Sequence, residues 1–218
     1  MRKLVSASML AADKSKLIDE LKRLEQNDVD LVHFDVMDNV FVPNTSFNDD
    51  TFSKIRKYSN LNFEIHLMVE NPFDYINNYF YDENDVIIIH YESFSDEKEF
   101  LKCILQIKEH HKVGVSIKPA TSIDVLLPYL SLLDYVLIMS VEPGFGGQKF
   151  MPSALEKINK LHQIKLDNDY GYVVEVDGGI NDETSILCIE NNIDILVSGS
   201  YLFKEDMMER VGKIRCEK

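Results

Sequence analysis

The feature that most constrains this chain is a regular alternation between short β-branched runs and longer amphipathic stretches. Eight such runs recur at residues 3–8, 30–36, 62–68, 85–90, 113–118, 135–141, 171–177 and 194–199. Between the first two, Leu17, Leu21 and Leu24 repeat with helical spacing and place the charged side chains on the other face. Runs that are apolar on both faces are typical of buried parallel strands. The pattern therefore predicts an α/β protein with a parallel sheet.

Helix-start signals fall at the places where this alternation requires them. Pro72 and Pro152 each stand where a first helical turn would begin. Asn181, followed by Asp182 and Glu183, forms a plausible N-cap with an acidic first turn. These residues support helices after the third, sixth and seventh runs.

Two architectures accept eight such units, and the polar residues distinguish them. An open doubly wound sheet binds ligands at one switch point, whereas a closed (β/α)8 barrel gathers all strand ends around one mouth. Polar residues stand at the ends of many runs: Ser8, His33, Asp35, His66, His90, Lys118, Asp177 and Ser198. An open sheet could not bring so many ends together. We therefore expect a TIM barrel, with residues 1–218 forming a single domain.

Charge and cysteine usage exclude several classes of partner. The chain carries 23 Lys and Arg against 37 Asp and Glu, a net charge of −14, and no basic stripe. Nucleic acid and membrane surfaces are therefore not expected as partners. The apolar residues near the N-terminus run directly into Asp13 and Lys14, which favours a strand over a signal peptide. Three widely spaced cysteines indicate no disulfide framework, and we expect a cytoplasmic protein.

One face of three different runs carries groups that bind metals, because strand side chains alternate between faces. These faces hold His33, Asp35 and Met37 on the second run, Glu64, His66 and Met68 on the third, and Glu175 and Asp177 on the seventh. A lone inward histidine is more often a core residue. Two imidazoles and two carboxylates at one barrel mouth, however, suit one divalent metal ion such as Zn, Fe, Mn or Co. Asp35 and Asp177 would repel each other without a cation.

Glycine-bearing segments follow the last three runs. They are residues 142–148, with Gly144, Phe145, Gly146 and Gly147, then residues 177–180, with Gly178 and Gly179, and finally residues 198–200, with Gly199 and Ser200. Each alone could be a tight turn. Three at one end of a barrel favour a phosphate cradle, because glycine lets backbone N–H groups approach an anion. An acidic chain needs such a device to hold a phosphate.

Five segments between Ser6 and Phe203 stand out together: HFDVMDNVFVPN, EIHLMVENP, SVEPGFGGQKFMP, EVDGGIN and VSGS. In sequence, order and spacing they resemble the signature segments of the ribulose-phosphate 3-epimerase family. The resemblance implies a phosphate-binding (β/α)8 barrel that interconverts D-ribulose 5-phosphate and D-xylulose 5-phosphate in pentose phosphate metabolism. Inverting C3 through an enediolate requires two acid–base groups, which the resemblance places at Asp35 and Asp177.

The resemblance also assigns the remaining site residues. It implies that His33, Asp35, His66 and Asp177 are the metal ligands. It implies substrate contacts for Ser8, His66, Gly144, Phe145, Gly146, Gly147, Asp177, Gly178, Gly179, Gly199 and Ser200. Met37, Met68 and Met139 match methionines that line the reaction centre, although core filling is their other interpretation. From its position at the end of the fourth run, and not from the resemblance, His90 is expected near the pocket without a catalytic role.

Two departures and several alternatives accompany this assignment. Ala7 stands where the family commonly has Pro, and Asn39 stands where it usually has Gly. Asn tolerates a left-handed turn, so the loop is expected to survive. A sister epimerase acting on a hexulose 6-phosphate such as D-allulose 6-phosphate is the alternative function. A Schiff-base aldolase is disfavoured because the sixth run holds no lysine, and a non-catalytic sugar-phosphate sensor because no acid or base is missing. A homo-oligomer is left open.

Overall fold

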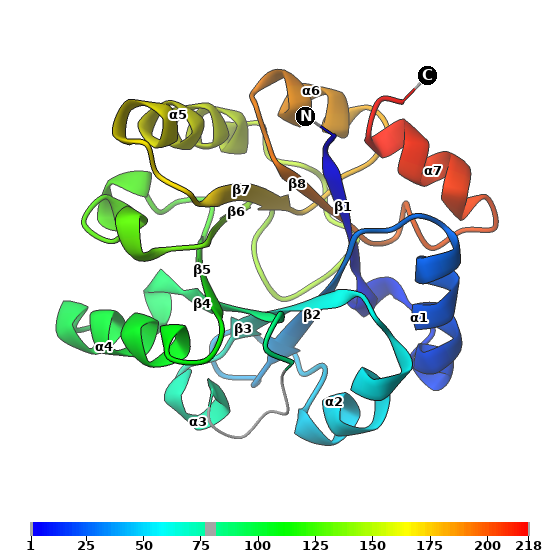
Figure 1. Ribbon diagram of the computed structural model, residues 1–218, viewed down its shortest axis with the longest axis horizontal. Coiled ribbons are helices and arrows are strands. Elements are labelled where there is room, and N and C mark those ends of the chain that lie inside the picture. The colour runs from blue at the N-terminus through cyan, green and yellow to red at the C-terminus, as the bar shows by residue number, and fades with distance from the viewer. Residues whose placement is uncertain (1, 77–81, 218) are drawn as a thin grey trace.

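The computed structural model describes residues 2–76 and 82–217, within which eight parallel strands close into a barrel (Figure 1). The strands are β1 Leu4–Ser8, β2 Leu31–Met37, β3 Asn62–Met68, β4 Val86–His90, β5 Lys112–Ile117, β6 Tyr135–Met139, β7 Val173–Asp177 and β8 Ile195–Ser198. Each strand pairs with the next along the chain, and β8 closes the ring on β1. The predicted TIM barrel is confirmed, and every predicted run ends within two residues of an observed strand.

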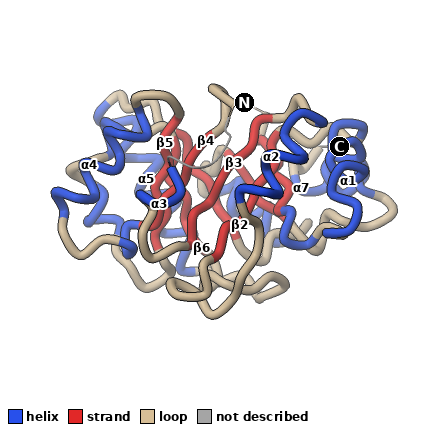
Figure 2. Tube along the Cα trace, turned by 90° about the horizontal axis from the view of Figure 1, so that it is seen from below, coloured by secondary structure: helices blue, strands red, loops and turns tan. Residues whose placement is uncertain are grey.

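Helices pack around the outside of the barrel, and loops cross its two ends (Figures 1 and 2). They are α1 Leu17–Gln26, α2 Asp49–Ile55, α3 Phe73–Ile76, α4 Glu97–Lys108, α5 Ser153–Asn168, α6 Thr184–Glu190 and α7 Met207–Ile214. Helices α3 and α5 begin directly after Pro72 and Pro152, as predicted. The Asn181 side chain accepts the N–H groups of Glu183 and Thr184 at 2.8 and 3.0 Å in the turn before α6. The helix begins later than predicted, so Asp182 and Glu183 precede its first turn and do not form it. In the described part of the chain, no helix is both long and apolar enough to cross a membrane.

The connection between β5 and β6 departs from the expected helix. It contains only two short 3-10 helices, Ile123–Leu126 and Leu130–Leu132. Pro128 lies between them and lacks the N–H group that a continuous helix would need. The amphipathic pattern therefore forms two separate turns, which still bury Ile123, Leu126 and Leu130 against the barrel.

The barrel separates apolar from polar side chains by strand parity. On β2, Val32, Phe34 and Val36 face outward and join the apolar core beneath the surrounding helices. The alternate residues His33 and Asp35 point into the barrel, where both are buried. Burying such groups is costly unless they are paired or bind a cation, so this interior position already marks a site.

Candidate active site

Strand register brings the predicted site residues to one level of the barrel. Asp35 on β2 is directly opposite His66 on β3, and Met37 is opposite Met68. On the other side of the interior, Asp177 ends β7 opposite Met139 of β6. Residues in register on neighbouring parallel strands share a level, and closure of the sheet turns both pairs toward the same axis. The barrel thus joins groups that lie up to 142 residues apart (177 minus 35).

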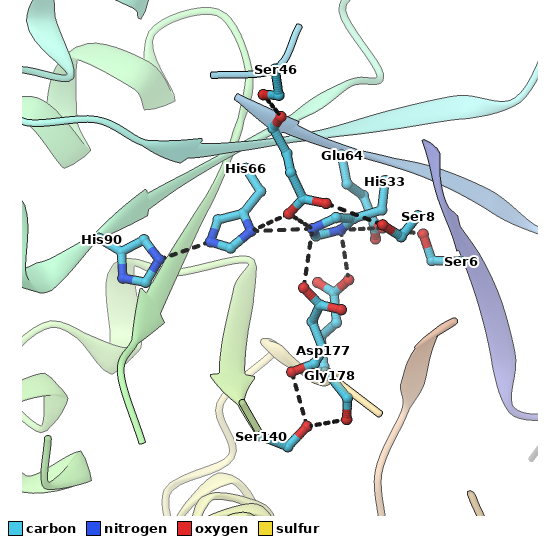
Figure 3. A network of polar contacts seen from close by, with 12 residues as sticks. Ser6, Ser8, His33, Ser46, Glu64, His66, His90, Ser140, Asp177 and Gly178 are labelled. Atoms are coloured by element: carbon cyan, nitrogen blue, oxygen red, sulfur yellow. Dashed lines mark hydrogen bonds and ion pairs between the residues drawn. The ribbon is translucent and has the colours of Figure 1, made fainter. Parts of the chain in front are cut away.

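His33, Asp35, His66 and Asp177 form a compact cluster, with one donor atom from each within 4.8 Å of the others. The His66 Nδ1 atom lies 3.2 Å from both His33 Nε2 and Asp35 Oδ1. His33 Nε2 is 3.5 Å from Asp35 Oδ1 and 4.0 Å from Asp177 Oδ2. Figure 3 shows His33 between His66 and Asp177. All four predicted ligands are therefore brought together.

Neighbouring strands hold the two aspartates of this cluster. The Ser8 hydroxyl, at the end of β1, donates to Asp35 Oδ2 at 3.1 Å. The Ser46 hydroxyl donates to the Asp35 carbonyl. Ser140, just after β6, donates its hydroxyl to the carbonyl oxygens of Asp177 and Gly178 at 2.9 and 2.7 Å. The Asp35 side chain is thus tied to the end of β1, and the backbone of Asp177 is tied to the residue that follows β6.

The Nδ1 atom of His33, the ring nitrogen that does not face the cluster, lies near two carboxylates. The sequence did not predict these contacts. His33 Nδ1 lies 3.4 Å from Glu64 Oε2 and 3.5 Å from Glu175 Oε1. Ser6 donates its hydroxyl to Glu64. Both glutamates are fully buried, and neither oxygen of Glu175 has a hydrogen bond among the described residues. The inward parity of Glu64 and Glu175 is the only sequence signal for this pair.

The outer nitrogen of His66 contacts a second histidine. His66 Nε2 lies 2.9 Å from His90 Nε2, and His90 Nδ1 lies 3.1 Å from Glu92 Oε2. His90 is fully buried and is not among the residues that line the cavity described below. It lies behind His66 because β4 follows β3 around the barrel (Figure 3).

The surroundings shift the pKa values of Asp35 and Asp177 in opposite directions. Burial by itself would raise the pKa of Asp35, but the hydrogen bonds and charges of His33 and His66 outweigh it and lower that pKa. Burial and the neighbouring Asp35 charge raise the pKa of Asp177 to about 7. One carboxyl group therefore favours its ionised form and the other its protonated form. Opposed shifts in one site are typical of an acid–base pair.

The pKa values of His33 and His66 are also shifted in opposite directions. Burial lowers the pKa of His66 to about 3, and the neighbouring His90 and His33 act in the same direction. For His33, burial is outweighed by Asp35, Glu175 and Glu64, which together raise its pKa well above the usual value. His66 is therefore a neutral ring, which is the form that can bind a metal.

The donor set fits a divalent cation. Two imidazole nitrogens and two carboxylate oxygens converge, and His33 Nε2 and His66 Nδ1 face each other at 3.2 Å. Two lone pairs at that distance repel unless a proton or a cation lies between them. Nitrogen and oxygen donors of this kind hold Zn, Fe, Mn or Co. The cluster could therefore hold one divalent metal ion.

A cavity of about 1010 Å³ opens at this end of the barrel. The predicted site residues that line it are Ser8, Asp35, Met37, Met68, Met139, Gly144, Phe145, Gly146, Gly147, Asp177, Gly178, Gly179, Gly199 and Ser200. His33 and His66 lie buried beneath it. The three methionines are buried and also line the cavity. Phe145 is 56% exposed, which places its ring at the rim rather than the floor.

The loop after β6 is held across the mouth by side-chain amides. Gln148 donates to the carbonyl oxygens of Glu142 and Phe145 at 2.7 and 2.8 Å. Asn44, in the loop after β2, donates to the Gly144 carbonyl at 2.8 Å. These bonds tie the loops after β2 and β6 together, so the glycines stand in a defined place at the cavity.

The loop after β2 tolerates its departure from the family pattern. Asn39 has a φ of 62°, the left-handed conformation expected for Asn in place of Gly. The Asp38 carboxylate accepts the N–H groups of Val40 and Phe41 at 2.8 Å each. Ala7, the other departure, is fully buried in β1. Neither residue belongs to the four-residue cluster.

Gly178, in the cavity wall, requires glycine both for its backbone angle and for the space around it. Its φ is 124°, and an added Cβ would lie 2.6 Å from Val141 Cγ2. We expect Gly178→Ala to lower the free energy of unfolding by about 1–3 kcal/mol, as measured by urea denaturation. Gly171→Ala, where an added Cβ meets nothing within 4 Å, is the matched control and should change it by less than about 0.5 kcal/mol. Equal stability of the two variants would contradict this packing.

Comparisons with known proteins agree with the geometry. Residues 4–203 match the sequence profile described as the ribulose-phosphate 3 epimerase family. The chain is 40% identical over 217 residues to the ribulose-phosphate 3-epimerase of Chlamydia pneumoniae, covering 97% of this chain and 92% of that one. It is 36% identical to the Bacillus subtilis protein of the same name, with 98% and 99% covered.

Solved structures support the architecture. KGPDC from Streptococcus mutans superposes with a TM-score of 0.69 at 12% identity, covering 99% of this chain and 97% of that one. A mutant tryptophan synthase alpha-subunit from Pyrococcus furiosus gives the same TM-score and identity, with 98% and 97% covered. At such low identity these matches establish the barrel fold alone.

Proposed function

This chain belongs to the ribulose-phosphate 3-epimerase family, and we propose that it interconverts D-ribulose 5-phosphate and D-xylulose 5-phosphate at C3. The observation that carries the proposal is the pairing of Asp35 and Asp177 beside two buried histidines at one end of a cavity. The glycine loops of the same cavity provide for a phosphate. A sugar phosphate is thus the substrate class that the site fits.

Asp35 and Asp177 are the proposed acid–base pair. A base that removes the C3 proton tends to return it to the side it left, so inversion needs a second group on the other face. Asp35 on β2 and Asp177 on β7 approach the cavity from different sides of the barrel. One aspartate removes the proton while the other, protonated, delivers one to the opposite face of the enediolate. The reverse reaction exchanges their roles.

His33, Asp35, His66 and Asp177 are the proposed ligands of one divalent metal ion. Such an ion supplies Lewis-acid stabilisation of the negative charge that develops on the substrate oxygens. The protein residues around it then hold the aspartates in place. Ser8 orients Asp35 through Oδ2, and Ser140 fixes the backbone of Asp177.

The glycine-bearing loops are the proposed phosphate subsite. Gly178, Gly179, Gly199 and Ser200 line the cavity beside the cluster, and backbone N–H groups there can bind an anion. The methionines Met37, Met68 and Met139 give the reaction centre an apolar wall, which limits access of water to the enediolate.

A direct comparison of substrates tests this function. We expect turnover of D-ribulose 5-phosphate, measured by coupled detection of D-xylulose 5-phosphate, with kcat/KM at least about tenfold above that for D-allulose 6-phosphate. A preference for the hexulose would transfer the same chemistry to the sister activity. Absence of turnover on both sugars, with Zn²⁺, Mn²⁺ or Co²⁺ supplied, would contradict the epimerase assignment.

A further inference from the structure

We infer that Glu92 acts through His90 to fix the tautomer of His66, so that His66 Nδ1 presents a lone pair to the four-residue cluster. Glu92 and His90 are therefore positioning residues for the proposed metal ligand, outside the cluster itself. The hydrogen-bond order itself is independent of the proposed function, and only its effect on His66 as a metal ligand rests on that function. The hydrogen-bond order from Glu92 to His66 can be measured without substrate.

The Glu92 carboxylate is held in one orientation by two groups that donate to the same oxygen. Its Oε1 atom accepts the backbone N–H of Lys118 at 2.7 Å, and it also accepts the Thr121 hydroxyl. Its Oε2 atom faces His90 Nδ1 at 3.1 Å. Burial alone would raise the pKa of Glu92, but His90 and these donors outweigh it and bring the pKa to about 2. Glu92 is therefore an acceptor at both oxygens.

The positions of the hydrogens on His90 and His66 follow from the role of Glu92 as an acceptor. Because Glu92 accepts, His90 Nδ1 carries the hydrogen of the neutral imidazole ring, which holds only one. His90 Nε2 then has a lone pair directed at His66 Nε2, 2.9 Å away, so His66 Nε2 must carry the hydrogen. The remaining nitrogen, His66 Nδ1, is left with a lone pair 3.2 Å from Asp35 Oδ1 and from His33 Nε2.

The opposite hydrogen-bond order is unfavourable at the contact between His90 and Glu92. If His66 Nδ1 carried the hydrogen, His90 Nε2 would have to donate, and His90 Nδ1 would face the Glu92 carboxylate as a second acceptor. Two acceptors 3.1 Å apart in a buried place leave both groups unsatisfied, and among the described residues no other hydrogen bond reaches Glu92 Oε2. At the Asp35 end the matching gap has a second donor available, because His33 Nε2 lies 3.2 Å from His66 Nδ1 and 3.5 Å from Asp35 Oδ1. Figure 3 shows that His90 and His66 lie in line with the cluster, so the hydrogen-bond order set by Glu92 is passed on to the cluster.

The substitution Glu92→Gln reverses this order for a specific reason. The Lys118 backbone N–H is an obligatory donor, so the amide oxygen of the glutamine must face it and the NH₂ group must face His90. His90 Nδ1 then accepts, His90 Nε2 donates, and His66 Nδ1 receives the hydrogen that blocks it as a ligand. Thr121→Val is the matched control, because it removes one donor to Glu92 but keeps the carboxylate.

Two measurements test the inference. In the chain labelled with ¹⁵N-histidine, without added metal, we expect NMR to show hydrogen on His66 Nε2 and on His90 Nδ1. The Glu92→Gln variant should move the His66 hydrogen to Nδ1 and weaken Co²⁺ binding, followed by visible absorption, about 10- to 100-fold. Thr121→Val should stay within twofold of the parent.

The outcomes separate this inference from the proposed function. Hydrogen on His66 Nδ1 in the parent chain would overturn the inference whether or not the chain is an epimerase. So would a folded Glu92→Gln variant that keeps the parent tautomer and binds Co²⁺ as tightly. If Glu92→Gln fails to fold, the tautomer of the parent chain still decides the question.

Discussion

Asp177→Asn is expected to lower kcat for D-ribulose 5-phosphate by at least about 10²–10⁴-fold. The amide cannot exchange a proton with C3, and it also removes one carboxylate from the cluster. Asp177 lines the cavity and its backbone is held by Ser140, so the substitution leaves the surrounding contacts in place. A coupled assay of xylulose 5-phosphate formation measures the loss.

Deuterium exchange distinguishes a lost acid–base group from a merely damaged site. Asp35 remains able to remove the C3 proton from one of the two sugars. In D₂O the variant should therefore incorporate deuterium at C3 of that sugar faster than it forms the other one. Asp167→Asn, an exposed substitution on α5, should behave as the parent chain. Equal exchange of both sugars by Asp177→Asn would contradict the assignment of one aspartate to each face.

Removal of divalent metal should have an effect of similar size. Electrostatic stabilisation by a bound cation is worth several kcal/mol, so treatment with a chelator should lower activity about 10²-fold or more. Zn²⁺, Mn²⁺ or Co²⁺ should restore it. The same ions should raise the melting temperature, because a ligand at 100 times its Kd stabilises the native state by about 2.7 kcal/mol.

A substitution of His33 tests whether the effects of metal on activity and on melting temperature arise at the four-residue cluster. His33→Gln should abolish the rise in melting temperature on adding metal, because His33 contacts the other three cluster residues. His110→Gln, at an exposed position, should preserve it. Activity unchanged by chelation, with complete metal removal verified by elemental analysis, would contradict a metal-assisted reaction.

Much of the site could be predicted because strand parity and family motifs are local. The alternation on β2 places His33 and Asp35 on one face whatever the rest of the chain does. The φ of Asn39 likewise follows from a local preference. The helix expected between β5 and β6 is absent, although the signal against it, Pro128, is also local and was not used in the prediction. These features depend on only a few neighbouring residues.

The sequence by itself determined the barrel, the polar faces and the identity of the four clustered residues. Only the tertiary structure decided which side chains outside the cluster contact these four residues. That Glu64 and Glu175 flank His33, and that Glu92 reaches His66 through His90, depends on inter-strand register and barrel closure. The same structure sets opposite pKa shifts on Asp35 and Asp177, because burial and charge at each position come from several strands at once. Such contacts join residues far apart in the chain, and no local pattern specifies their distances.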